Sequence, residues 1–140
     1  MQAIQLLKQE HVKAKAAFQE IETAPATQRA ALWAKLRPEL EKHEKKEETY
    51  LYGPAARDPQ ADRSLKDWET RHHREVEEAE GLIKTISHLD ASDPKWLETV
   101  KKLHAALESH IREEEQEIWP KIEKAWGPAR LESAGSQMAA

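Results

Sequence analysis

Apolar side chains in this chain recur three and four residues apart in four long blocks, which are separated by proline and glycine. This spacing places the apolar residues on one face of an α-helix, so each block predicts an amphipathic helix. We expect the helices over about residues 4–24, 26–52, 62–89 and 94–126. Four helices with short connections are typical of an all-α fold, an antiparallel up-down-up-down four-helix bundle.

Prolines and glycines indicate where these helices bend and end. Pro38 and Pro120 fall inside the second and fourth blocks and predict kinks there. Gly127-Pro128 closes the fourth block, so we expect the bundle to occupy residues 1–126. The small and polar residues 127–140 predict a flexible C-terminal tail.

The composition excludes several classes of protein. Because there is no Cys, disulfide frameworks, iron–sulfur clusters, thiolate zinc sites and cysteine nucleophiles are ruled out. The 22 Lys and Arg against 26 Asp and Glu give a net charge of −4, so we expect no nucleic-acid partner. No apolar run approaches the ~18 residues of a membrane span, and the N-terminus lacks the pattern of a signal peptide. We therefore expect a cytoplasmic protein without membrane contact.

Histidines occupy positions on the predicted apolar faces, where polar side chains are normally rare. His11 lies in the apolar series of the first block, and His43 and His110 extend the series of the second and fourth. Glu47 follows His43 by four residues, and Glu114 follows His110 by four residues. This spacing places each glutamate on the same helix face as its histidine. A buried carboxylate without a partner costs roughly several kcal/mol, so two of them beside imidazoles indicate a bound cation.

The third block contains two adjacent histidines. His72 lies near the middle of the apolar series and His73 at its edge, so this pattern does not decide between them. Glu77 follows His73 by one helical turn and is a further candidate. The candidate metal ligands are therefore His11, His43, Glu47, His72, His73, His110 and Glu114. The pattern predicts Glu44 and Glu115 on solvated faces, with Glu115 as a substitute for Glu114 if the helix rotates.

A sequence repeat relates the two His-x-x-x-Glu segments. Residues 43–52 resemble residues 110–119 at a constant offset of 67, from the histidine through the glutamate to an aromatic residue. The repeat indicates a duplicated helical hairpin, which suits a pair of metal ions bridged by Glu47 and Glu114. Histidine and carboxylate ligands without thiolate favour iron, manganese or zinc over copper(I).

On these residues the chain resembles the hemerythrin-like family, also called the HHE cation-binding domain. The resemblance covers roughly residues 2–125 and rests on His11 with Lys15 and Phe18, residues 43–54, residues 73–76 and residues 110–120. It implies a non-haem di-iron centre with two iron ions, an oxo or hydroxo bridge, and the ligands His11, His43, Glu47, His73, His110 and Glu114. The match of Val76 to a family position favours His73, whereas the apolar series favours His72.

The resemblance also implies a function: binding of oxygen, nitric oxide or peroxide at the di-iron centre, in sensing, stress response or iron handling. Oxygen-carrying hemerythrins have a second histidine four residues after the first on the third helix, where this chain has Val76 or Glu77. This departure favours the single-domain bacterial members. The alternatives are a di-iron enzyme that decomposes peroxide and a metal-stabilised bundle that binds a protein partner. A binding protein is favoured over an enzyme, and Trp and Tyr near the helix ends favour a homodimer.

Overall fold

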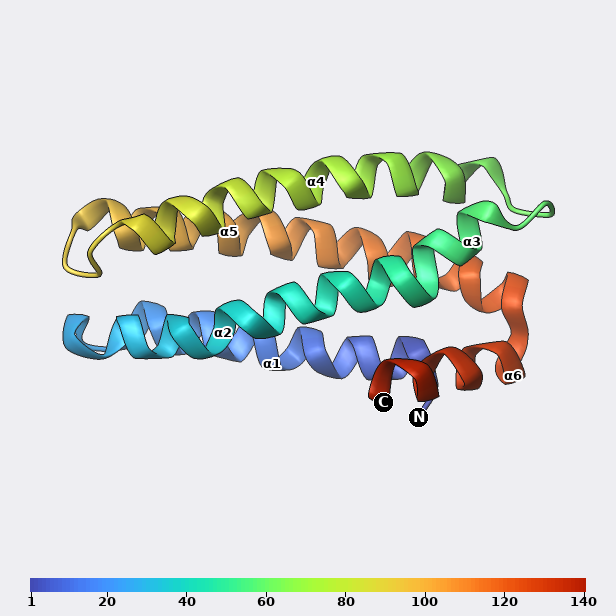
Figure 1. Cartoon of the computed structure of the whole chain (residues 1–140), viewed down its shortest axis with the longest axis horizontal. Helices are drawn as coiled ribbons and strands as arrows, with labels where there is room; N and C mark the ends of the chain where they lie inside the picture. Colours follow the sequence, from blue (N-terminus) through green and yellow to red (C-terminus); the bar gives the residue numbers. More distant parts are fainter.

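The computed structural model describes residues 1–140, and all of its regular structure is helical. Four long helices form the body: α1 (Ala3–Thr23), α2 (Ala26–Glu47), α4 (Arg63–His88) and α5 (Pro94–Glu113). Further segments continue α2 and α5: η1 (Glu48–Tyr52), α3 (Gly53–Arg57), η2 (Glu114–Ile118) and α6 (Trp119–Ala139). Figure 1 shows the long helices side by side and alternating in direction, which confirms the predicted antiparallel four-helix bundle.

Three of the four long helices begin at residues whose side chains cap their N-termini, and α2 begins after Pro25 without such a cap. The side chains of Gln2, Asp62 and Asp93 each accept a hydrogen bond from the backbone N–H two residues later. These bonds satisfy donors that have no partner within the helix. Only two residues connect α1 to α2 and five connect α4 to α5, and such short connections make the neighbouring helices antiparallel.

The irregular turns of the bundle lie at positions related by the sequence repeat. Where we expected a kink, α2 continues unbroken through Pro38. The π-helical turns η1 and η2 come later, directly after α2 and α5, and each is closed by a backbone N–H that bonds to the carbonyl five residues earlier. Pro120 lies in the first turn of α6, directly after η2, and has no N–H to donate to the carbonyls of that preceding turn.

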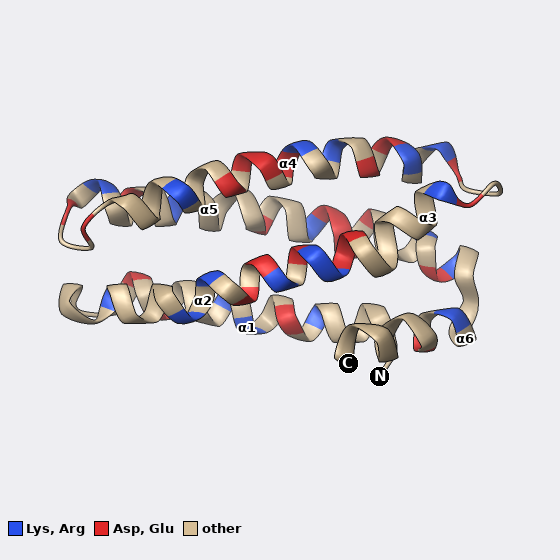
Figure 2. Cartoon of the chain, in the orientation of Figure 1, with Lys and Arg blue, Asp and Glu red and all other residues tan.

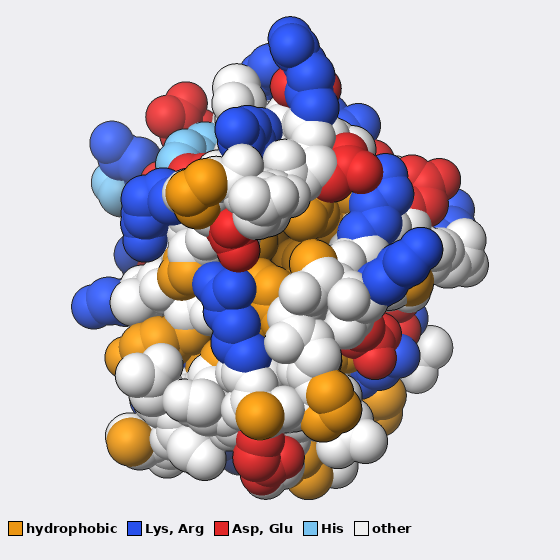
Figure 3. Space-filling model, turned by 90° about the vertical axis from the view of Figure 1, so that its right-hand side faces the viewer, with side chains coloured by type: hydrophobic (Ala, Val, Ile, Leu, Met, Phe, Trp, Pro, Cys, Tyr) orange, Lys and Arg blue, Asp and Glu red, His pale blue; other side chains and the backbone are white.

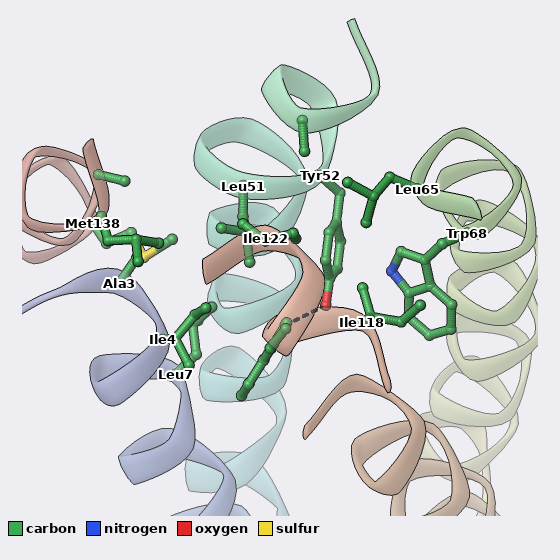
Figure 4. Packing of buried hydrophobic residues seen from close by; sticks show 14 residues of the cluster. Ala3, Ile4, Leu7, Leu51, Tyr52, Leu65, Trp68, Ile118, Ile122 and Met138 are labelled. Atoms are coloured by element: carbon green, nitrogen blue, oxygen red, sulfur yellow. Dashed lines mark hydrogen bonds between the residues drawn. The ribbon is translucent and has the colours of Figure 1, made fainter. Parts of the chain in front are cut away.

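The core consists of two apolar clusters at opposite ends of the bundle. One cluster joins the start of α1, η1, α3, the start of α4, η2 and α6. The other joins the second half of α1, α2, the second half of α4 and α5. In the first cluster, Tyr52 stands between Ile122 on one side and Leu65 and Trp68 on the other (Figure 4). Polar side chains that lie between these clusters are shielded from water on both sides.

The C-terminal residues differ from the predicted flexible tail. Gly127, at φ 74°, interrupts the helix as expected, but residues 128–139 then form a further helical stretch. Its residues Leu131, Ala134 and Met138 are buried in the first apolar cluster. Figure 1 shows this stretch beside the N-terminal end of α1, and Figure 2 shows that few of its residues are charged. Burial of apolar side chains against α1 stabilises the segment.

The surface is mostly charged, with both signs interspersed along the long helices (Figure 2). At the end of the bundle that carries α3 and the bend of α6, hydrophobic side chains are visible in a hollow framed by charged ones (Figure 3). None of the helices has the length and hydropathy needed to cross a membrane.

Candidate metal centre

Six of the seven candidate ligands come together midway along the bundle, between the two apolar clusters. Five of them are buried, and the side chain of His43 is 12% exposed. They come from the four long helices and the start of η2: His11, His43, Glu47, His72, His110 and Glu114. Because each long helix is amphipathic, residues on its apolar face enter the interior together with the neighbouring Leu, Ile and Trp side chains.

The possible ligand atoms form two groups inside the bundle and a third, partly exposed group of Glu48, Glu69 and His73; within each group they lie within 4.8 Å of one another. The first group contains His11, His43, Glu47 and Glu114, and the second contains Glu44, Glu47, His72 and His110. Glu47 belongs to both groups, so the two groups are adjacent.

Glu47 presents one carboxylate oxygen to each group. Its Oε2 lies 3.2 Å from Nε2 of His43, whereas its Oε1 lies 3.4 Å from Nε2 of His72. Ligand atoms that bind one ion at ~2.1 Å are separated by roughly 3.0–3.4 Å, so these distances suit shared ions. A carboxylate in this position can bridge two metal ions.

Glu114 also lies between histidines of the two groups. Its Oε1 lies 3.4 Å from Nε2 of His11 and 3.3 Å from Nε2 of His110. Its Oε2 accepts a hydrogen bond from the hydroxyl of Tyr52, and that hydroxyl accepts one from Nε1 of Trp119 at 2.7 Å. The carboxylate is thus held in place by buried aromatic side chains and is available to both groups.

Three of the four buried histidines are oriented by a second carboxylate on a neighbouring helix. Each donates a hydrogen bond from Nδ1: His11 to Glu115 at 2.9 Å, His43 to Glu10 at 2.8 Å, and His110 to Glu75 at 2.6 Å. In the neutral form of such a ring, Nδ1 is protonated and bonded outward, and the lone pair of Nε2 faces the centre. This arrangement is typical of metal-binding histidines.

Unpaired polar atoms at the centre indicate that the residues fit metal ions. Both carboxylate oxygens of Glu47, Oε1 of Glu114, and Nε2 of His72 and His110 are buried without a hydrogen bond. Each such atom costs about 1–3 kcal/mol, and charged groups cost more. Cations would satisfy these atoms together, and imidazole with carboxylate is a donor set that suits iron, manganese and zinc.

The buried carboxylates also change the acidity of the histidines. Burial lowers the pKa of His72, but Glu44 and Glu47 outweigh this effect and raise the pKa to about 10. Burial likewise lowers the pKa of His110, while Glu114 raises it, with a net result of about 12. The pKa of Glu47 is raised by its burial and by the neighbouring Glu114. The carboxylates therefore favour positive charge on the neighbouring imidazoles, and protons compete with other cations for the centre.

The two adjacent histidines on α4 lie in different environments. His72 has a side chain only 1% exposed and faces Glu47. His73 is 52% exposed and lies 3.0 Å from Glu48 at the surface. Glu77 is exposed and belongs to neither buried group. The geometry thus agrees with the apolar series rather than with the family match to His73, and metal binding by either histidine stays a prediction.

Sequence reasoning missed carboxylates that surround the centre. The helical pattern predicts Glu44 on a solvated face, whereas its Oε2 lies 3.2 Å from Nε2 of His72. Glu10 and Glu75 contact histidines on other helices, and no spacing within a single helix reveals such contacts. Glu115 contacts the outer nitrogen of His11 and does not take the place of Glu114.

Two cavities reach the centre from the surface. The first, of about 490 Å³, lies between α1, α2 and α5; it reaches His11 and His43, and its wall combines charged side chains with apolar ones such as Phe18, Leu40 and Ile111. The second, of about 480 Å³, lies between α2 and α4 and reaches His72 past several acidic side chains. Charged and apolar side chains line both cavities, and each leads from the surface towards histidines of the centre.

A four-helix bundle with two adjacent histidine–carboxylate groups in its core defines a class of metal-binding helical proteins. The chain belongs to the hemerythrin family, since the family model described as Hemerythrin HHE cation binding domain matches residues 2–122. Among solved structures, it is similar to a Hemerythrin HHE cation binding domain-containing protein from Mycobacterium kansasii. The two are 26% identical with a TM-score of 0.81, over 99% of this chain and 83% of that chain. No curated protein matches the chain at a significant level.

Proposed function

We propose that this is a non-haem di-iron protein that binds oxygen, nitric oxide or peroxide, in sensing, stress response or iron handling. The observation that carries the proposal is the pair of buried ligand groups that share Glu47. His11 and His43 would hold one ion and His72 and His110 the other, with Glu47 and Glu114 as bridges. Membership of a cation-binding family supports this assignment.

Iron would supply a redox-active centre with an open coordination position for a small ligand. The residues of the chain determine the environment of that centre. Glu10, Glu75 and Glu115 hold the imidazole rings in orientation, and Tyr52 holds one oxygen of Glu114. The apolar clusters on either side exclude water, which strengthens electrostatic interactions at the centre.

The first cavity supports access of a small ligand to one side of the centre. It reaches His11 and His43, and Ile111 forms part of its wall there. A diatomic molecule or peroxide could approach this position without displacing a side chain of the core.

The proposal is tested by the metal content and visible spectrum of protein purified from an iron-supplemented culture. We expect about two irons per chain and near-ultraviolet bands of a bridged ferric pair. These bands are expected to disappear on reduction, and nitric oxide added to the reduced protein is expected to give new visible bands. Stoichiometric zinc, or no metal, would leave the bundle intact but contradict the redox function.

The peroxide-decomposing alternative is distinguished by turnover. A binding protein is expected to react with peroxide stoichiometrically, whereas an enzyme would consume many equivalents and retain its iron. Oxygen release from added peroxide, followed by an iron assay, measures this difference. The remaining alternative, a metal-stabilised interaction bundle, predicts no charge-transfer bands after iron loading.

The proposal also includes a homodimer in the cytoplasm. The hydrophobic side chains in the hollow at the α3 end of the bundle support a contact between copies (Figure 3). Light scattering of the purified protein would give twice the chain mass of 16.1 kDa for a dimer, and a monomer mass would contradict it.

A further inference from the structure

The third group of possible ligand atoms lies outside the buried centre, where α4 faces the start of η1. It consists of Glu48, Glu69 and His73. Nε2 of His73 lies 3.0 Å from Oε2 of Glu48 and 3.9 Å from Oε1 of Glu69. Glu69 and His73 are four residues apart on α4, so they share a face of that helix. The proposed function uses none of these three side chains.

The contact between Glu48 and His73 is not a hydrogen-bonded pair. Oε2 of Glu48 is shielded from water and makes no hydrogen bond, although Nε2 of His73 is only 3.0 Å away. An unsatisfied carboxylate oxygen is unfavourable, and a cation between these two atoms would satisfy both. The spacing is that of two ligands on one ion. The side chains remain 36% and 52% exposed, so a cation from solvent can reach them.

The second cavity connects this surface group to the buried centre. Glu48 and His73 line the cavity, and so does His72, whose side chain is only 1% exposed. Both ring nitrogens of His72 lack a hydrogen bond. Glu44, four residues before Glu48, also lines the cavity, and its Oε2 lies 3.2 Å from Nε2 of His72. Carboxylate and imidazole groups are therefore present from the exposed end of the cavity to its buried end.

The charges along the second cavity favour cations. Its wall contains one basic side chain, Lys45, and five acidic ones: Glu41, Glu44, Glu48, Glu77 and Glu80. The wall of the first cavity contains three lysines, Lys13, Lys15 and Lys35. A cavity lined mainly by negative charge raises the local concentration of cations and speeds their entry.

We propose that Glu48, Glu69 and His73 form a surface cation site at which ferrous iron enters the second cavity on its way to the buried centre. The site binds the ion from solvent, and the carboxylates of the cavity wall then bind it in turn as it moves towards His72. This inference rests on the proposed function and deepens it. It gives His73 a role in metal uptake and leaves the final binding of the ion to the buried residues.

The test compares His73→Gln and Glu48→Gln with the wild type and with His88→Gln, the same change at an exposed histidine of α4 outside the cavity. Metal-free protein is mixed anaerobically with ferrous iron, and a chelator added at successive times removes ions that have not reached the buried centre. We expect His73→Gln and Glu48→Gln to fill about tenfold more slowly than the wild type and His88→Gln. All four proteins are expected to reach the same final iron content.

The surface site is also measured directly, in protein whose buried centre is already filled with iron. Mn²⁺ is the probe, because carboxylate and imidazole ligands suit it. The electron paramagnetic resonance signal of free Mn²⁺ gives the bound fraction. We expect the wild type and His88→Gln each to bind one Mn²⁺ per chain more than His73→Gln does.

The results that would overturn the inference are distinguishable from a failure of the proposed function. Equal filling rates in all four proteins, or equal Mn²⁺ binding by His73→Gln and His88→Gln, would exclude the surface group as the entry site and leave the proposed centre standing. A lower final iron content in His73→Gln would make His73 a ligand of the centre instead. If the wild type protects no iron from the chelator, the proposed function fails, and the uptake role fails with it.

Discussion

Three of the four histidines of the centre have two nitrogens with different partners, and this difference organises the site at the scale of single residues. Nε2 faces the shared carboxylates, while Nδ1 of three of the rings donates to a glutamate on another helix. The outer bond selects the tautomer and fixes the plane of the ring. The affinity of the centre for metal therefore depends on residues that do not touch the ion.

Loss of an outer carboxylate is expected to weaken metal binding. In Glu75→Ala, Nδ1 of His110 loses its acceptor at 2.6 Å, so the ring is less basic and less well oriented. We expect the affinity for ferrous iron to fall about 10–100-fold, measured by competition with a chelator. Glu78→Ala, an exposed change on the same helix, serves as the control. Equal affinities for the two variants would argue against a role for the outer bond.

The adjacent histidines on α4 are expected to respond differently to substitution. His72→Ala removes a buried side chain that faces Glu47, so we expect loss of one of the two ions. His73→Ala removes a side chain that is 52% exposed, and two ions are expected to remain. Iron assays of the two purified proteins measure the difference. The reverse result would identify His73, the residue favoured by the family match, as the ligand.

At the scale of elements, the last part of α6 depends on a close approach between two backbones. A Cβ atom on Gly135 would lie 2.1 Å from the carbonyl oxygen of Met1 and 2.8 Å from backbone atoms of Gln2 and Ala3. These contacts are with backbone, so they cannot be relieved by a change of rotamer. The absence of a side chain at this position lets residues 128–139 pack against the start of α1.

Gly135→Ala is therefore expected to destabilise the protein by about 1–3 kcal/mol, through overpacking against α1. Urea unfolding gives the free energy, and hydrogen exchange of residues 128–139 shows whether the loss is local. Gly81→Ala is the matched control, because nothing lies within 4 Å of a Cβ there and the change suits a helix interior. We expect it to stabilise by roughly 0.5–1 kcal/mol. If Gly135→Ala had the same free energy of unfolding and the same hydrogen exchange as the wild type, this packing would be contradicted.

At the scale of the whole molecule, folding, protonation and metal binding are linked through the same buried groups. In the metal-free protein the carboxylates of the centre raise the pKa of His43 and His72 above that of an exposed histidine, against the opposing effect of burial. Metal ions must displace these protons to reach the imidazole nitrogens. The stability of the metal-free protein is thus expected to fall as the pH rises, whereas the affinity for metal is expected to rise.

For His72 the pKa rises from 6.5 to about 10 on folding without metal. A raised pKa stabilises the folded state fully below about pH 6.5, and this stabilisation is lost as the pH rises towards 10. We expect the Tm of the metal-free protein to fall between pH 6.5 and 9, while the affinity for ferrous iron rises by about tenfold per pH unit for each proton displaced. Thermal scans and chelator competition over this range measure both. A flat profile for both quantities would mean that the centre does not titrate.

The sequence by itself determined the four helices, the bundle and the residue types of the centre. These follow from apolar spacing within each helix and from the His-x-x-x-Glu pairs. Both patterns lie within a single helix, so they do not depend on how the helices pack. The repeat further indicated that His43 with Glu47 and His110 with Glu114 are equivalent.

Only the tertiary structure decided which of two adjacent histidines lies inside, because a residue at the edge of an apolar face turns inward or outward with small rotations of its helix. It also brought Glu10, Glu44 and Glu75 to histidines on other helices, which no spacing in one helix encodes. The C-terminal helix was missed for a related reason. Its small residues look unstructured alone, and it is stabilised by contact with α1, more than a hundred residues earlier in the chain.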